Sequence, residues 1–295
     1  MKWTILYRGP LSSCNYACDY CPFAKRRNTR DELEDDATKL KKFVDWVAKR
    51  REQIGILVTP WGEALIHRHY QQAIVTLSHL PNVWRVAIQT NLSCRLDWIN
   101  DCNKSVAAFW TTYHPSQISL HRFAEQCARL DESGIRYSVG VVGLREHFPA
   151  IRDLRATLSP TTYIWINAYK RIADYYSVQE LEELRTVDSL FDWNRVTHPS
   201  LGRACRAGHT AFTVDGDGNM RRCYFIKSVI GNIYEPGFEN SLVARPCSNE
   251  SCGCHIGYVH MPHLQLDQIY GDGLLERIPL SAAVHSRTCS EALAE

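Results

Sequence analysis

Short apolar runs alternate with amphipathic segments through the first two thirds of the chain, and this alternation limits the possible folds more than any other feature. Leu40, Phe43, Val44 and Val47 show the i, i+3, i+4, i+7 spacing of a helix with one buried face. Strands that alternate with helices form a parallel sheet with crossover helices. Six units are too few for a closed eight-stranded barrel, so we predict an α/β fold built on a partial (β/α)6 barrel. The six runs expected to form strands are residues 3–7, 55–59, 83–90, 106–112, 136–142 and 162–167.

The composition is that of a globular protein without a polyelectrolyte partner. Hydrophobic residues make up 45% and charged residues 22% of the 295-residue chain, and the formal net charge is +2. This balance favours neither nucleic acid nor a membrane as a partner. The first apolar run ends at Arg8, too early for a signal peptide, and no run approaches the ~20 apolar residues of a membrane span. We therefore expect a cytoplasmic protein, whose 12 cysteines are metal ligands, reactive thiols or, like Cys94, Cys102 and Cys127, core residues.

Three cysteines follow the first strand candidate as Cys14-x3-Cys18-x2-Cys21, with Tyr20 directly before the last. A bare C-x2-C pair has a redox interpretation, and two such pairs indicate zinc. Three thiolates from one loop also suit a four-iron cluster, in which they leave one iron open to another ligand. Zinc with a distant fourth ligand remains the alternative at this point.

Other candidate site residues follow, or lie in, further strand candidates. Trp61, Gly62 and Glu63 come after the second candidate, Asn91 ends the third, and Gly140 lies in the fifth. In α/β barrels the C-terminal ends of the strands meet on one face, where active sites form. Each motif alone is weak, but together they indicate one site.

With these residues, the first two thirds of the chain resemble the core of the radical S-adenosyl-L-methionine (SAM) enzymes. The resemblance implies that Cys14, Cys18 and Cys21 bind a [4Fe–4S] cluster whose open iron holds the amino and carboxylate groups of SAM. Tyr20 would lie against the adenine. Such an enzyme receives an electron from a donor such as flavodoxin or ferredoxin and cleaves SAM to a 5'-deoxyadenosyl radical, which the barrel keeps away from water.

The remaining motifs resemble the SAM contacts of the same family. Gly62 and Glu63 match its G-G-E segment, which contacts the methionine amine, although Trp61 replaces the first glycine. Asn91 stands where the family has T-N-G and would hold the ribose or the carboxylate. Gly140 resembles a strand-five motif on the adenine side, but the pattern there is incomplete.

The composition changes in the last third of the chain. A capping box at residues 177–180 begins a helix, and a polar stretch at 193–200 follows it. We place the barrel at residues 1–195, a small cysteine-rich subdomain at 196–262, and a segment that packs back on the barrel at 263–295. Within the subdomain, residues 211–214 and 220–225 are expected to pair as a hairpin.

The cysteine-rich subdomain resembles the twitch subdomain, a shortened relative of the SPASM domain. Cys205, Gly218 and Cys223 have the spacing of its opening pattern. The resemblance implies one auxiliary [4Fe–4S] cluster, because Cys247-x4-Cys252-x-Cys254 departs from the longer pattern that holds two. Structural zinc is the alternative.

This subdomain offers five cysteines for four ligand positions. We favour Cys205, Cys223, Cys252 and Cys254 as the ligands and Cys247 as the spare thiol, with Cys289 as an alternative ligand. A thiol beside a radical site returns a hydrogen atom to the face of a carbon opposite the one attacked, which inverts that carbon.

A compact chain with one auxiliary cluster and a spare cysteine resembles the radical SAM epimerases of aminoglycosides. The resemblance implies a small-molecule substrate, an amino-sugar carbon as the target, and Cys247 as the hydrogen donor. Two enzyme alternatives stay open, namely a twitch-type dehydrogenase of an aminoglycoside pathway and an enzyme that modifies a ribosomal peptide. A non-catalytic metal module that binds a partner is the alternative from another class.

Overall fold

The computed structural model describes residues 2–23 and 26–280. Its main sheet has the strand order β10-β9-β8-β1-β2-β3-β4-β5-β6, and β7 and β11 pair separately. The described strands are β1 Lys2–Arg8, β2 Gln53–Val58, β3 Val83–Thr90, β4 Ala107–Tyr113, β5 Arg136–Gly143, β6 Ile164–Ala168, β7 His198–Pro199, β8 Ala211–Asp215, β9 Asn219–Arg221, β10 Val229–Asn232 and β11 Ser251–Cys252.

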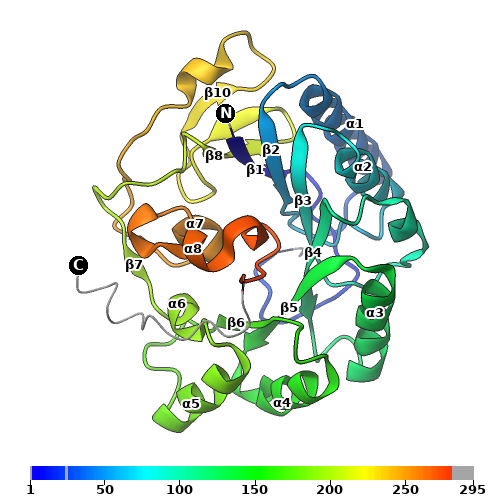
Figure 1. Cartoon of the computed structure of the whole chain (residues 1–295), viewed down its shortest axis with the longest axis vertical. Helices are drawn as coiled ribbons and strands as arrows, with labels where there is room; N and C mark the ends of the chain where they lie inside the picture. Colours follow the sequence, from blue (N-terminus) through cyan, green and yellow to red (C-terminus); the bar gives the residue numbers. More distant parts are fainter. Residues whose placement is uncertain (1, 24–25, 281–295) are drawn as a thin grey trace.

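The first six strands confirm the predicted α/β fold. Neighbours from β1 to β6 pair in parallel, and each strand lies within two residues of its predicted run at both ends. The sheet curves but does not close, because β6 and β10 form its two edges (Figure 1). The barrel is therefore partial, with its carboxyl-terminal strand ends on one face.

Helices α1 to α4 cover the convex side of this curved sheet (Figure 1). The Thr29 side chain accepts a hydrogen bond from the Glu32 N–H at the start of α1, and the Glu32 carboxylate accepts one from the Thr29 N–H. Leu40, Phe43 and Val47 are buried, as their spacing predicted. The helices are α1 Arg30–Ala48, α2 Arg68–Ser78, α3 Leu120–Ser133, α4 Phe148–Thr157, α5 Val178–Val187, α6 Phe191–Arg195, α7 His255–Tyr258 and α8 Leu266–Tyr270, with 3-10 turns at Asp97–Asp101, Arg145–His147, Phe238–Ser241, Pro262–Leu264 and Gly271–Gly273.

The last described part of the chain fills the concave side of the sheet. Helices α7 and α8 lie inside the curve (Figure 1), and Leu275 packs against Leu6 on its inner face. Glu276 is fully buried, and its carboxylate pairs with Arg85 at 3.3 Å and Arg136 at 2.8 Å. The buried charge of Glu276 is compensated only while its arginine partners stay in place. This segment therefore fixes the base of the barrel below the cavity described next.

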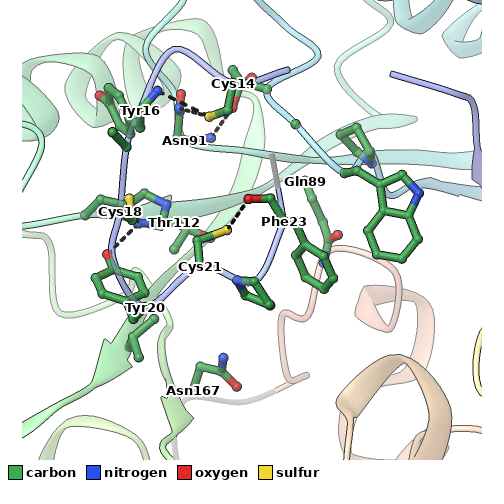
Figure 2. Close-up of a pocket in the computed structure, with 18 of the residues that line it drawn as sticks. Cys14, Tyr16, Cys18, Tyr20, Cys21, Phe23, Gln89, Asn91, Thr112 and Asn167 are labelled. Carbon is green, nitrogen blue, oxygen red and sulfur yellow. Dashed lines mark hydrogen bonds between the residues drawn. The ribbon is translucent and has the colours of Figure 1, made fainter. Parts of the chain in front are cut away.

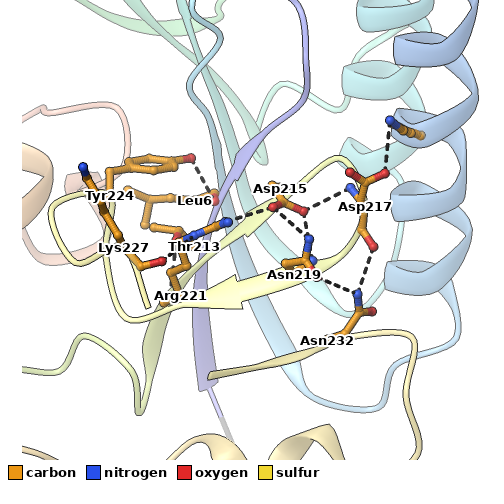
Figure 3. A network of polar contacts seen from close by, with 10 residues as sticks. Leu6, Thr213, Asp215, Asp217, Asn219, Arg221, Tyr224, Lys227 and Asn232 are labelled. Carbon is orange, nitrogen blue, oxygen red and sulfur yellow. Dashed lines mark hydrogen bonds and ion pairs between the residues drawn. The ribbon is translucent and has the colours of Figure 1, made fainter. Parts of the chain in front are cut away.

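The predicted hairpin forms from β8 and β9, and it extends the main sheet because β8 pairs with β1 in parallel. At its turn the Asp215 carboxylate accepts hydrogen bonds from the Asp217 and Asn219 N–H groups and pairs with Arg221 at 2.8 Å (Figure 3). The cysteine-rich region thus shares a sheet with the barrel. The domain limits given above stay a prediction.

The second strand of the hairpin is shorter than the predicted run 220–225, because β9 ends at Arg221. The next residue, Arg222, is buried, and its guanidinium donates to the carbonyl oxygens of Ala207, Arg245 and Pro246. These contacts to distant segments turn the chain out of the strand pairing. Cys94, Cys102 and Cys127 are buried in the core as predicted. Among the described residues, none of the helices is both long and apolar enough to cross a membrane.

Candidate active site

The carboxyl ends of β1 to β6 surround a cavity of about 870 Å³. Its described lining comes from the loop after β1, which we call the cysteine loop (residues 14–23), from residues 60–63 after β2, from the ends of β3, β4 and β5, and from residues 167–171 at and after β6. Asn91 and Asn167 lie on opposite sides of the cavity (Figure 2). Cavities at this face of a barrel hold the active site.

Side chains near its base hold the cysteine loop in place. The Asn28 Oδ1 atom accepts hydrogen bonds from the N–H groups of Ser12 at 2.9 Å and Ser13 at 2.8 Å. Within the loop, the Cys21 N–H donates to the Cys18 carbonyl oxygen at 3.2 Å, which closes a tight turn. The loop therefore has a defined shape without a disulfide.

The cysteine loop carries three thiols that could hold a metal centre. Cys14, Cys18 and Cys21 lie along one curved loop beside the cavity (Figure 2). Within the part of the chain that the structure describes, no three Cys, His, Asp or Glu side chains come close enough to share one metal ion. A zinc site needs that convergence, with ligand atoms about 2.3 Å from the ion. A four-iron cluster instead spreads its thiolate ligands over separate irons, and Cys14, Cys18 and Cys21 are the residues that would hold one here.

Glu63 is a buried carboxylate beside the cysteine loop. It accepts hydrogen bonds from the Thr90 hydroxyl at 2.8 Å and from the N–H groups of Asn91 at 2.6 Å and Leu65 at 3.0 Å. Burial raises its pKa to about 6, against the opposing effect of these three donors. The carboxylate is thus held in one position, and a cation in the cavity would favour its ionised form.

Gly62 brings the segment after β2 against the cysteine loop. A Cβ atom at this position would lie 1.7 Å from the Ser13 carbonyl oxygen, so only glycine fits. The neighbouring Glu63 N–H donates to that same carbonyl oxygen at 3.0 Å. On the other side, the Asn91 side chain donates to Asn15 Oδ1 at 3.1 Å and lies 3.8 Å from the Cys14 sulfur. These contacts join the ends of β2 and β3 to the loop.

Tyr20 lies in the cavity wall next to a histidine that the sequence analysis missed. Its hydroxyl is 2.7 Å from His114 Nδ1, and the Cys18 sulfur is 3.4 Å from the same nitrogen. Burial and, to a smaller extent, the charge of the nearby His147 lower the pKa of His114 to about 4. The ring is therefore neutral at pH 7. His114 directly follows β4, and its place at a strand end was the only signal in the sequence.

Gly140 lies apart from the other predicted contacts. It does not line the described cavity, and a Cβ atom there would lie 1.9 Å from the Trp165 ring. Trp165 and Trp110 themselves line the cavity, with ring centroids 5.4 Å apart and an interplanar angle of 80°. Gly140 therefore makes room for an aromatic ring at the cavity floor. Its predicted contact with SAM stays untested.

Each of the five C-terminal cysteines from Cys205 to Cys254 lies within electrostatic reach of at least one other. Burial raises the pKa of the Cys205, Cys223 and Cys252 thiols, that of Cys252 to about 12, and charge on neighbouring thiols adds to the effect. For Cys205 and Cys223 the neighbours include Cys247. The Cys247 N–H also donates to the Arg203 carbonyl oxygen at 2.8 Å.

Cys254 neighbours Cys252 and also lies near basic side chains. Burial raises the pKa of its thiol, and the positive charges of Lys170, Arg277 and Arg8 oppose that rise. Lys170 lines the cavity, and its ammonium donates to the carbonyl oxygen of Gly253. The Arg277 guanidinium lies 4.4 Å from the centroid of Trp165 at the cavity floor. Lys170 is thus near both Cys252 and Cys254, while Cys289 lies outside the described residues.

Two further basic side chains were missed because nothing in their spacing marks them. Lys170 and Arg171 follow β6 after one intervening residue and line the cavity. The Arg171 guanidinium donates to the Tyr20 carbonyl oxygen at 3.2 Å, which links the last strand of the barrel to the cysteine loop. Burial lowers the pKa of Lys170 to about 8.

No family model matches the sequence, and none of the curated proteins is similar to it. The fold is similar to solved structures of anSMEcpe with bound AdoMet, another name for SAM. One has 13% sequence identity over 81% of this chain and 83% of that chain, with a TM-score of 0.51. A second, with bound AdoMet and the Kp18Cys peptide, has 11% identity, coverages of 82% and 83%, and a TM-score of 0.52. This similarity establishes the fold.

Proposed function

We propose that this chain is a radical SAM enzyme that binds SAM and a [4Fe–4S] cluster in the cavity at the carboxyl ends of β1 to β6. The cysteine loop carries this proposal, because it places three thiols beside one cavity together with Glu63 and Asn91. A fold shared with AdoMet-bound anSMEcpe supports the same use of the cavity. Bound together, the cluster and SAM supply a 5'-deoxyadenosyl radical that takes a hydrogen atom from a substrate carbon.

The residues around the cavity hold and orient the bound molecules. Glu63 offers a fixed carboxylate to the SAM ammonium group, with its hydrogen bonds from β3 already made. Tyr20 and the neutral His114 form a flat surface beside the cysteine loop, their rings 6.0 Å apart and inclined by 13°. Trp110 and Trp165 close the floor and exclude water. Exclusion of water and fixed orientation are what a reactive radical requires.

The test is anaerobic reconstitution of the full chain with iron and sulfide. We expect iron–sulfur absorption, about four irons for each cluster, and release of 5'-deoxyadenosine from SAM after reduction. Serine at Cys14, Cys18 or Cys21 should abolish that release, while Cys102→Ser, at a core thiol outside the cavity, should not. A protein that takes up zinc but no iron, or that releases the nucleoside without the cysteine loop, would falsify the proposal.

We further propose that the reaction is an epimerisation in which a cysteine thiol is the second hydrogen donor. The radical takes one hydrogen atom from a carbon, and the thiol returns one to the opposite face and becomes a thiyl radical. One electron, from a donor such as flavodoxin or ferredoxin, and one proton restore the thiol, so the substrate undergoes no net redox change. Four other C-terminal cysteines then remain for one auxiliary [4Fe–4S] cluster.

The predicted donor is Cys247, with Cys252 and Cys254 among the ligands of the auxiliary cluster. The contacts support an alternative assignment with Cys254 as the donor. Cys247 shares its surroundings with Cys205 and Cys223, whereas Cys254, a neighbour of Cys252, also lies near Lys170 of the cavity lining. Product formation by alanine variants at the two positions separates these assignments.

A dehydrogenase is the second candidate, since it needs the same cavity and no hydrogen donor. The two reactions differ in product mass and in deuterium content. In deuterium oxide an epimerase product gains one deuterium that does not exchange, because a thiol exchanges its hydrogen with solvent, whereas a dehydrogenase product is two mass units lighter. Both measurements should be made with an aminoglycoside, the substrate predicted from the sequence. A peptide substrate tests the remaining alternative, an enzyme that modifies a ribosomal peptide.

A further inference from the structure

The cavity floor and walls suit a hydroxyl-bearing ring. Trp110 and Trp165 are only 4% and 5% exposed and form an aromatic floor. Gln89, Thr112 and Asn167 extend this surface from the ends of β3, β4 and β6, and their side chains have no hydrogen-bond partner among the described residues. Amides and hydroxyls both donate and accept hydrogen bonds. Neutral polar groups around an aromatic surface are the lining expected for a sugar-like molecule.

The charged groups of the cavity are mostly basic. Its described lining holds the basic side chains Arg26, Arg27, Lys170 and Arg171 and the carboxylates Asp19 and Glu63. Arg26 is paired with Glu32 outside the cavity. Glu63 is buried and already accepts three hydrogen bonds. Three cations without a carboxylate partner in the described structure therefore face one exposed aspartate.

Lys170 and Arg171 are held in place by backbone oxygens and keep donors in reserve. The Lys170 ammonium binds the carbonyl oxygens of Gly253 and Val196, which leaves one of its three N–H groups. The Arg171 guanidinium uses one of its five N–H groups on Tyr20. Fixed cations with unused donors are suited to bind phosphate or carboxylate.

We propose that the substrate of this site is a hydroxylated ring compound that carries an anionic group, phosphate or carboxylate, and that Lys170 binds this group. The inference rests on the proposed function, because it places the substrate in the cavity assigned to SAM. It departs from the aminoglycoside expected from sequence, since a polycation would meet Lys170 and Arg171 with a single free carboxylate, Asp19, to offset them.

Binding to the reconstituted, SAM-loaded protein under anaerobic conditions tests this inference by calorimetry. The probes are glucose 6-phosphate, glucuronate, glucose, inorganic phosphate and kanamycin. We expect glucose 6-phosphate or glucuronate to bind at least about tenfold more tightly than glucose, as a charge-assisted contact implies. The tighter of the two identifies the anionic group. Kanamycin should show no saturable binding.

Variants at Lys170 separate a charge contact from a structural role. Lys170→Gln should reduce the ratio of anion to glucose affinity to near one, and Lys170→Arg should restore most of it. A purely structural change would weaken both ligands equally and leave that ratio unchanged. Lys104→Gln, which removes an exposed lysine before β4 at the opposite end of the barrel, should change neither affinity.

The inference is overturned if kanamycin binds more tightly than either anion, if inorganic phosphate alone binds as tightly as glucose 6-phosphate, or if Lys170→Gln leaves the ratio intact. Failure of the proposed function has a different signature, because it removes iron uptake and 5'-deoxyadenosine release whatever the ligand. A protein that cleaves SAM but prefers the polycation would thus refute the substrate class alone.

Discussion

The two cysteine-rich regions of this chain are assembled in opposite ways. The cysteine loop carries three thiols between residues 14 and 21, and Asn28, fewer than twenty residues away, holds its base. The C-terminal cysteines come from separate segments that meet only through distant contacts. Cys247 binds Arg203, and β11 pairs with β7. A site made by one short segment is visible in the sequence, whereas a site made by several segments depends on the whole fold.

The largest expected effect separates the two regions directly. Cys18→Ser should lower 5'-deoxyadenosine release at least about a hundredfold, because SAM cleavage needs the complete cluster of the cysteine loop. Cys223→Ser should lose the iron of the second region, about four per chain, and keep that release. Iron content and nucleoside release measured on the same samples check both variants. An equal loss of 5'-deoxyadenosine release in the two variants would mean that the two cysteine-rich regions act as one unit.

The next expected effect lies within the second region. If Cys254 is the hydrogen donor, Cys254→Ala should still release 5'-deoxyadenosine and yield no inverted product, while Cys247→Ala should lose iron. If Cys247 is the donor, as predicted from the sequence, Cys247→Ala should release 5'-deoxyadenosine without inverted product, and Cys254→Ala should lose iron. Product stereochemistry, deuterium content and iron per chain distinguish them. Full inversion by both variants would remove the thiol from the reaction.

A smaller effect is expected when the long-range contacts of the second region are removed. The Arg222 guanidinium ties together Ala207, Arg245 and Pro246, so Arg222→Met leaves three carbonyl oxygens without a donor. We expect a loss of about 2–4 kcal/mol in the free energy of unfolding, with iron lost from the second region first. Chemical denaturation and iron analysis measure this. Arg51→Met, at an exposed surface site, is the control and should change stability by less than about 0.5 kcal/mol.

The contrast also explains what could be predicted from the sequence. The strand runs, the cysteine loop, Glu63 and Asn91 follow from local patterns, and the structure places them around one cavity. His114, Lys170 and Arg171 were missed because each is a single residue after a strand. Their function depends on where the strand ends, which periodicity fixes only to within a few residues.

Two predictions, for Gly140 and for the pair Cys252 and Cys254, rest on local sequence patterns to which the structure adds tertiary contacts. Gly140 was predicted to approach SAM, which stays a prediction, and the structure places Trp165 from the next strand against it. Cys252 and Cys254 were predicted to bind together because they are close in sequence. The chain turns between them, since Cys252 ends β11 and Cys254 is the N-cap of α7, but the two residues stay neighbours and their shared binding of a cluster stays a prediction. No sequence pattern predicts the contact between Gly140 and Trp165 or the turn between Cys252 and Cys254.

The smallest expected effect concerns Glu63, a buried carboxylate that belongs to the first region. Its pKa is raised to about 6 by burial, so it is ionised at pH 7.5 and protonated at pH 5. The SAM ammonium group favours the ionised form. The affinity for SAM should therefore be constant above pH 7 and fall by up to about tenfold per pH unit below 6. Calorimetric titration of the reconstituted protein between pH 5 and 8 measures it.

The Glu63→Gln variant isolates this carboxylate from other titrating groups. The amide oxygen can still accept from Thr90 and Leu65, but the NH2 group cannot accept from the Asn91 N–H and the side chain carries no charge. We therefore expect SAM to bind about tenfold more weakly at pH 7.5, with little dependence on pH. The same variant gives a second readout in the SAM-free protein. A carboxyl group whose pKa is raised in the folded state contributes stability at low pH and loses it as the pH rises through about 6. Glu63→Gln should abolish that part of the pH dependence of unfolding, and an unchanged profile would show that Glu63 does not titrate in this range.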